Sequence, residues 1–273
     1  MPIPIRLRST TRVAAALAVV ALAVTGISDA GVRAAAPPER DDMRVPILMY
    51  HRIAPAEEAR DARRDLVVAP DEFARQMEAL ARSGWHSITL ATLAHDLAAK
   101  STPPSRTFVV TIDDGRDDGL THAAPILRRR GFRATYFVVA GRIGKPGHMT
   151  AAQLRTLTAA GDEIADHTTS HVPLTGQDRA ALHHEICDAA ETIGASTGHR
   201  PETFAYPFGK VDEAAAAAVR ACPGIMLAVT TQRGIGESWT GRFEIPRLPV
   251  GPGTSPADLV AMLEPMQPLE PNA

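Results

Sequence analysis

Two short segments carry side chains whose types and spacing suit metal chemistry. Asp113 and Asp114 are adjacent carboxylates that directly follow an apolar run, where an unpaired charge is costly unless a cation offsets it. His167 and His171 stand four residues apart, a spacing at which two imidazoles can share one metal ion. Each segment also has an ordinary interpretation, as an Asp-Gly turn with a helix cap and as two surface histidines.

Taken together, the two segments predict a catalytic metal site. One carboxylate and two histidines leave positions on a metal open, as catalytic zinc sites do, and a second carboxylate beside them can serve as a general base. We therefore expect Asp114, His167 and His171 to be the ligands of a divalent metal, with zinc as the first choice, and Asp113 to be the base. Cobalt and nickel suit the same ligands.

The predicted elements place these segments at the ends of strands. Apolar, β-rich runs cover residues 45–50, 107–112, 163–166 and 203–206, and helical stretches separate most of the predicted strands. This alternation predicts an α/β fold with a mostly parallel sheet, open or closed into a barrel, in which ligands bind at the carboxyl ends of the strands. Residues 52–69 are charged and irregular, and we expect them to form a surface excursion.

Three motifs resemble those of a known family. Thr111–Gly115 and His167–His171 are similar to the first two motifs of the polysaccharide deacetylases (carbohydrate esterase family 4, the NodB homology domain), and Phe204–Gly209 is similar to the third. The resemblance covers about residues 45–250. It implies a distorted (β/α) barrel of about seven strands in a single domain. It also implies that Asp113 is the base and that Asp114, His167 and His171 bind the metal, which is usually zinc.

The third motif is expected to contact the substrate. By the resemblance, the backbone N–H of Phe208 holds the oxyanion, and Gly209 lets the substrate approach the backbone closely. We expect Tyr206 and Pro207 to contribute to the same substrate-binding segment. The Tyr206 ring could line a sugar cleft, or it could equally belong to the core or the rim.

The sequence departs from the family pattern at two positions. The third motif usually begins with an Arg that orients the base; here Ala205 stands in its place, and we expect Arg247 to substitute for it. The usual late His that serves as general acid is also missing, because no His follows His199. Residues 45–51 resemble the opening of a subgroup with rearranged motif order, which includes poly-β-1,6-N-acetylglucosamine deacetylases and in which an early His is the acid; here that residue is His51.

Composition bounds the remaining properties. Lys and Arg number 29 against 31 Asp and Glu, so no basic excess indicates a nucleic-acid partner. Residues 1–36 have the basic start, apolar middle and small-residue end of a signal peptide, although a retained membrane anchor is the alternative. We expect a linker at 37–44, a deacetylase domain at 45–265, and a monomer that is exported to the periplasm or the medium. Cys187 and Cys222 could pair in such a compartment or remain buried thiols.

The expected activity is removal of N-acetyl groups from a polysaccharide or oligosaccharide that contains N-acetylglucosamine. Alternatives are an O-acetyl esterase acting on a polymer such as xylan, a glycoside hydrolase with paired carboxylates, and a sugar-binding relative without catalysis. The sequence leaves the polymer itself open.

Overall fold

The computed structural model describes residues 44–59, 63–236 and 240–264. They belong to one compact unit, which spans Glu39–Ala273. The expected signal peptide at 1–36, and the expected linker apart from Arg44, lie outside the described residues. Within the described ranges, no helix is both long and apolar enough to cross a membrane.

Seven parallel strands close into a barrel, as predicted. Their order around the barrel is β1 (Ile47–Tyr50), β10 (Ile245–Pro249), β9 (Leu227–Arg233), β8 (Thr203–Ala205), β7 (Glu163–Asp166), β6 (Thr135–Val138) and β5 (Thr107–Ile112). Pairing of Ile47 with Val109 and of Tyr50 with Ile112 joins β1 to β5 and closes the ring. An eighth strand, β4 (His86–Ile88), pairs with the first residues of β5.

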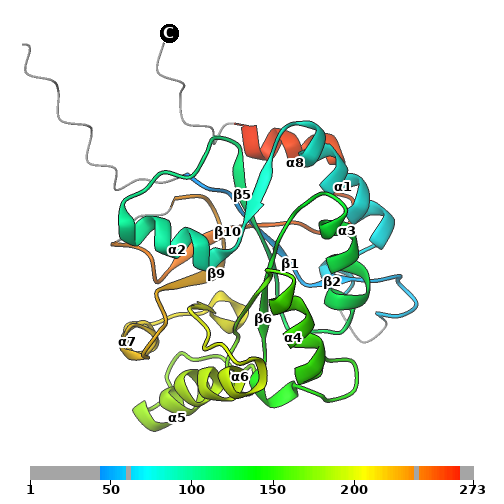
Figure 1. Ribbon diagram of the computed structural model, residues 1–273. Coiled ribbons are helices and arrows are strands. Elements are labelled where there is room, and N and C mark those ends of the chain that lie inside the picture. Colours follow the sequence, from blue (N-terminus) through cyan, green and yellow to red (C-terminus); the bar gives the residue numbers. More distant parts are fainter. Residues whose placement is uncertain (1–43, 60–62, 237–239, 265–273) are drawn as a thin grey trace, which may run out of the picture. The chain divides into compact units, whose positions relative to one another are not determined.

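Helices surround the strands (Figure 1). They are α1 (Pro70–Arg82), α2 (Leu90–Ala99), α3 (Ala124–Arg128), α4 (Ala151–Ala159), α5 (Arg179–His183), α6 (Ala189–Thr197), α7 (Glu213–Ala221) and α8 (Pro256–Leu263). Their starts follow from local sequence: Pro70 occupies the first turn of α1, and Thr150 and Gln153 form a capping box at α4. Two π-helical segments, η2 (Gly119–Ala123) and η4 (His184–Asp188), precede α3 and α6.

The barrel interior is apolar at one end and polar at the other. Ile47, Val109, Ala165 and Ile245 form a buried cluster with α2, whose first N–H, on Leu90, donates to Thr135 at the start of β6. Alternate residues of a strand point the same way, so Asp113, four residues after Val109, continues the inward-facing row beyond the end of β5. The apolar cluster therefore fills the amino-terminal end of the barrel and leaves the carboxyl end for polar side chains.

The prediction that residues 52–69 form an irregular surface excursion is wrong in part. Arg52–Ile53 form strand β2, which pairs with β3 (Val67–Val68). Arg52 is buried because its guanidinium forms an ion pair with Asp118, at the start of η2. Burial of a charged residue is sustained by such a partner, which the local sequence does not reveal.

Candidate active site

Six of the expected site residues meet at the carboxyl end of the barrel: His51, Asp113, Asp114, His167, His171 and Arg247. Asp113 follows β5, His167 follows β7, His51 follows β1, and Arg247 lies on β10, two strands from β8. Because all these strands run parallel, their ends lie at the same edge, which brings residues separated by more than a hundred positions together.

Arg247 holds Asp113 by two parallel hydrogen bonds. Its Nη1 donates to Oδ1 at 2.8 Å and its Nη2 to Oδ2 at 2.7 Å, and both side chains are almost completely buried. Arg247 is itself fixed, because Nε donates to the Thr230 carbonyl and Nη1 to Thr111 Oγ1. The guanidinium thus reaches the carboxylate from β10, whereas the family pattern supplies it from the position of Ala205.

The guanidinium also keeps Asp113 ionised. Burial by itself raises the pKa of this carboxyl, but the charge and hydrogen bonds of Arg247 outweigh burial and hold the pKa below its usual range. His51 Nε2 lies 3.9 Å from Asp113 Oδ2, so a second proton-transfer group faces the same carboxylate.

Asp114, His167 and His171 form a cluster with the composition of a metal site. Their candidate ligand atoms all lie within 4.8 Å of one another. His171 Nε2 is 3.3 Å and His167 Nε2 is 3.7 Å from Asp114 Oδ1. The cluster stands beside the Asp113–Arg247 pair, since Asp113 and Asp114 are consecutive.

The histidines of this cluster are prepared to act as ligands. His167 Nδ1–H donates a hydrogen bond to the Ala205 carbonyl at 2.8 Å, which leaves the unprotonated Nε2 directed at Asp114. Burial lowers the pKa of His167, and burial together with His167 lowers the pKa of His171 to about 4. Both imidazoles are therefore neutral at pH 7, which is the form that binds metal. The residues present fit a divalent cation.

The site is built on strained backbone. Six non-glycine residues in the described ranges have positive φ, and four of them lie here: Asp114, Thr168, His171 and Phe208, with φ of 75°, 68°, 62° and 60°. Such conformations cost about 1–3 kcal/mol each and persist only where the surroundings fix them. The strain is thus concentrated in the segments that carry the candidate ligands and the third motif.

The four residues of the third motif that are expected to bind substrate lie in different surroundings. Phe208 is 55% exposed and its ring centroid lies 4.8 Å from that of His171, which places it at the rim of the cluster. Pro207 is buried. Tyr206 is fully buried and packs against Phe204, so among the alternatives its ring takes the place in the core.

Gly209 is required for a different contact from the one expected. Its φ is 66°, and a Cβ there would lie 2.5 Å from the Thr231 backbone nitrogen and 2.0 Å from Thr231 Oγ1. The absent side chain therefore allows the 3₁₀ segment η5 (Pro207–Gly209) to pack on β9.

Two residues at the site were not anticipated. Thr111 accepts from Arg247 and donates to the Leu48 carbonyl. It precedes Asp113 by two residues, so strand alternation could have identified it. Glu185 accepts two hydrogen bonds from Ser170, between the candidate ligands, and nothing in the local sequence indicates this contact.

The fold and the cluster together define a parallel (β/α) barrel with a candidate metal centre at the carboxyl ends of its strands. Residues 100–224 match the family model for polysaccharide deacetylase. This match includes all three motifs but neither His51 nor Arg247. Residues 100–224 are therefore those of a polysaccharide deacetylase domain, and this family is generally metal-dependent.

Individual relatives agree with this assignment. The Bacillus subtilis (strain 168) protein YxkH, whose name places it among the polysaccharide deacetylases, is 28% identical over 224 residues, which cover 82% of this chain and 77% of that protein. The structure of the Streptococcus pyogenes deacetylase PplD in complex with acetate is similar with a TM-score of 0.74 and 26% identity, covering 83% of this chain and 100% of that chain. IcaB from Ammonifex degensii shares the fold, with a TM-score of 0.69 at 23% identity over 80% of this chain and 96% of that chain.

Proposed function

We propose that this protein is a metal-dependent deacetylase that hydrolyses the acetamide groups of a polysaccharide or oligosaccharide containing N-acetylglucosamine. The observation that carries the proposal is the cluster of Asp114, His167 and His171, with ligand atoms within 4.8 Å of one another beside an Asp113 held ionised by Arg247. The cluster can hold a metal ion that acts as an electrophile, and Asp113 lies next to it as a base.

The ligand atoms would be Nε2 of each histidine and a carboxylate oxygen of Asp114, and zinc is our first choice of metal. When bound, a divalent ion supplies a Lewis acid that polarises the acetyl carbonyl and makes water more acidic.

The remaining steps belong to side chains of this protein. Asp113 accepts a proton from the attacking water, and its two hydrogen bonds to Arg247 hold it in place while it does so. His51, which faces the same carboxylate at 3.9 Å, donates a proton to the leaving nitrogen. The Phe208 N–H lies in the first turn of η5, where N–H groups have no acceptor within the helix, and it stabilises the oxyanion.

The choice of amide over ester rests on the relatives. Chitin deacetylase 1 of Cryptococcus neoformans is 28% identical over 111 residues, which cover 41% of this chain and 23% of that protein. Its name describes deacetylation of chitin, a polymer of N-acetylated sugars, and this supports the amide. The similar PplD structure holds acetate, which amide and ester hydrolysis both release, so it supports deacetylation in general. The adjacency of Asp113 and Asp114 also fits a metal site better than the separated carboxylates of a glycoside hydrolase.

Acetate release tests the proposal. We expect the wild-type protein to release acetate from N-acetylglucosamine oligomers and to lose this activity with a chelator and regain it with zinc. Asp113→Asn should lower the rate by about 100-fold or more, because it removes the base. Asp71→Asn, at an exposed position in the first turn of α1, is the matched control and should retain full activity.

Each alternative predicts a different product. Acetate from acetylated xylan but not from the amide substrates would favour an O-acetyl esterase, and shortened chains without acetate would favour a glycoside hydrolase. Full activity of Asp113→Asn would remove Asp113 as the base.

We also propose that the protein works outside the cytoplasm. The signal-like sequence of residues 1–36 supports export, and a disulfide between Cys187 and Cys222 is typical of an oxidising compartment. N-terminal sequencing of the protein recovered from the periplasm or the medium tests this; recovery of the intact chain from the cytoplasm alone would contradict it.

A further inference from the structure

The segment between the two candidate histidine ligands is held from two sides. On one side, N–H groups of the 3₁₀ turn η3 (Ala140–Arg142) donate to the carbonyls of Thr168 and Thr169 at 2.9 Å. On the other side lies the π-helical segment η4. Thr169 N–H donates to the Glu185 carbonyl at 3.0 Å, and Thr169 Oγ1 donates to the His184 carbonyl at 2.8 Å.

Glu185 adds a side-chain contact to these backbone contacts. Its Oε2 accepts from the Ser170 N–H at 2.9 Å, and its Oε1 accepts from Ser170 Oγ at 2.5 Å. The Glu185 residue is 6% exposed although Ser170 is exposed, so a buried carboxylate reaches outward to fix a surface backbone position. Burying a carboxylate is costly, and these hydrogen bonds offset part of that cost.

The position of Ser170 explains why such a contact would matter. Thr168 and His171, on either side of it, both have positive φ. Strained backbone of this kind relaxes unless neighbouring groups hold it. Relaxation here would rotate the His171 imidazole away from Asp114, from which it is now separated by 3.3 Å.

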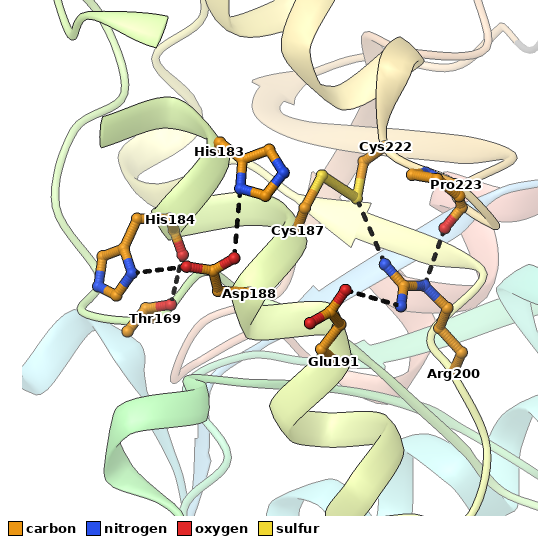
Figure 2. Close-up of a disulfide and its surroundings, with 9 residues drawn as sticks. All are labelled: Thr169, His183, His184, Cys187, Asp188, Glu191, Arg200, Cys222 and Pro223. Atoms are coloured by element: carbon orange, nitrogen blue, oxygen red, sulfur yellow. Dashed lines mark hydrogen bonds and ion pairs between the residues drawn. A yellow bond between two sulfur atoms is a disulfide. The ribbon is translucent and has the colours of Figure 1, made fainter. Parts of the chain in front are cut away.

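The scaffold that carries Glu185 is fixed in turn. Cys187, two residues further along η4, forms the disulfide with Cys222 at the end of α7. Figure 2 shows two contacts made by residues of η4. Thr169 lies beside His184, and Cys187 forms the disulfide with Cys222. The segment that carries Glu185 is thus linked covalently to the end of α7.

We propose that Glu185 is a positioning residue for the metal centre. Its carboxylate holds Ser170, and with it the strained backbone from Thr168 to His171, in the conformation that turns the His171 imidazole toward Asp114. This inference rests on the proposed metal centre and concerns how that centre is held.

The test is the zinc dissociation constant of the full chain, measured by competition with a chromogenic chelator. Glu185→Ala should weaken zinc binding by about 10-fold or more, the usual effect of removing a group that orients metal ligands. Glu185→Gln should retain most of the affinity, because its amide oxygen can accept from the Ser170 N–H and its amide nitrogen can donate to Ser170 Oγ. Rescue by Gln and not by Ala would distinguish positioning from a general need for charge.

Glu163 provides a matched control. Its carboxylate accepts hydrogen bonds from Thr135, Thr203 and the Ala91 N–H, but at the opposite end of β7. We expect Glu163→Ala to lower the melting temperature and leave the zinc affinity unchanged. Should Glu163→Ala weaken zinc binding as much as Glu185→Ala does, the effect is global and the inference is wrong.

Further outcomes complete the test. Wild-type affinity in Glu185→Ala overturns the inference, whereas a wild-type protein that binds no zinc overturns the proposed centre instead. If Glu185→Ala does not fold, Glu185→Asp decides, because a carboxylate one methylene shorter cannot keep both hydrogen bonds; unchanged affinity in that variant also overturns the inference.

Discussion

Arg247 and Asp113 are the most deeply buried charged pair at the site. Removing one partner of such a pair leaves a buried charge without compensation, which destabilises a protein far more than the loss of a surface pair does. Arg247 also contacts the Phe137 ring, with Cζ 5.6 Å from the ring centroid, so it is part of the barrel core as well as of the site.

We expect Arg247→Leu to lower the free energy of unfolding by about 3 kcal/mol. Urea denaturation measures this, and a double variant with Asp113→Asn should recover part of the loss because no charge remains buried. Arg82→Leu breaks the exposed pair with Glu78 and should cost about 0.5 kcal/mol. Equal losses in Arg247→Leu and Arg82→Leu would show that the buried pair contributes no more than a surface one.

At the scale of elements, short non-strand segments decide where the functional groups point. The strands end before the ligands begin, and η5, η3 and η4 then set the direction of the chain. The third motif illustrates this, because η5 packs on β9 through a contact that only a residue without a side chain permits.

Gly209→Ala should therefore displace η5 and lower both stability and deacetylation. The new Cβ would lie 2.5 Å from backbone of Thr231, which cannot move aside cheaply, in addition to the strain of a positive φ. Gly131→Ala is the control, since Gly131 also has a positive φ, 71°, but nothing lies within 4 Å of its added Cβ. We expect about 1–2 kcal/mol of destabilisation at Gly131 from φ alone, and a clearly larger loss at Gly209; a comparable loss at both positions would contradict the role given to the close contact.

At the scale of the whole domain, the disulfide links η4 to the end of α7. It closes a loop of 35 residues, for which chain entropy gives about 3–4 kcal/mol of stabilisation. The double variant Cys187→Ala and Cys222→Ala should lose about this much unfolding free energy, as measured by chemical denaturation. A reducing agent should destabilise the wild-type protein by the same amount and leave the double variant unaffected; insensitivity of the wild-type protein would argue against the bond.

Much of the fold was predictable from local pattern. The apolar runs at 107–112 and 163–166 became β5 and β7 with the predicted bounds, because a strand buried on both faces has a continuous apolar signature. The sequence also predicts one longer helix over about residues 178–196; this helix is present but is divided by η4. The sequence pattern did not predict helix α8, which packs with α1. It also did not predict strand β2, because many of the surrounding residues are charged.

The sequence by itself determined the alternation of strands and helices, and hence which residues follow strand ends. Parallel strands bring their carboxyl ends together, so Asp113, Asp114, His167 and His171 were placed near one another by topology alone. Only the tertiary structure decided that Arg247 meets Asp113, that Tyr206 faces the core, and that Glu185 reaches Ser170. The physical reason is that periodicity reports which face of its own element a residue lies on, whereas a contact between elements depends on how the strands are ordered in the barrel and how the loops turn after them.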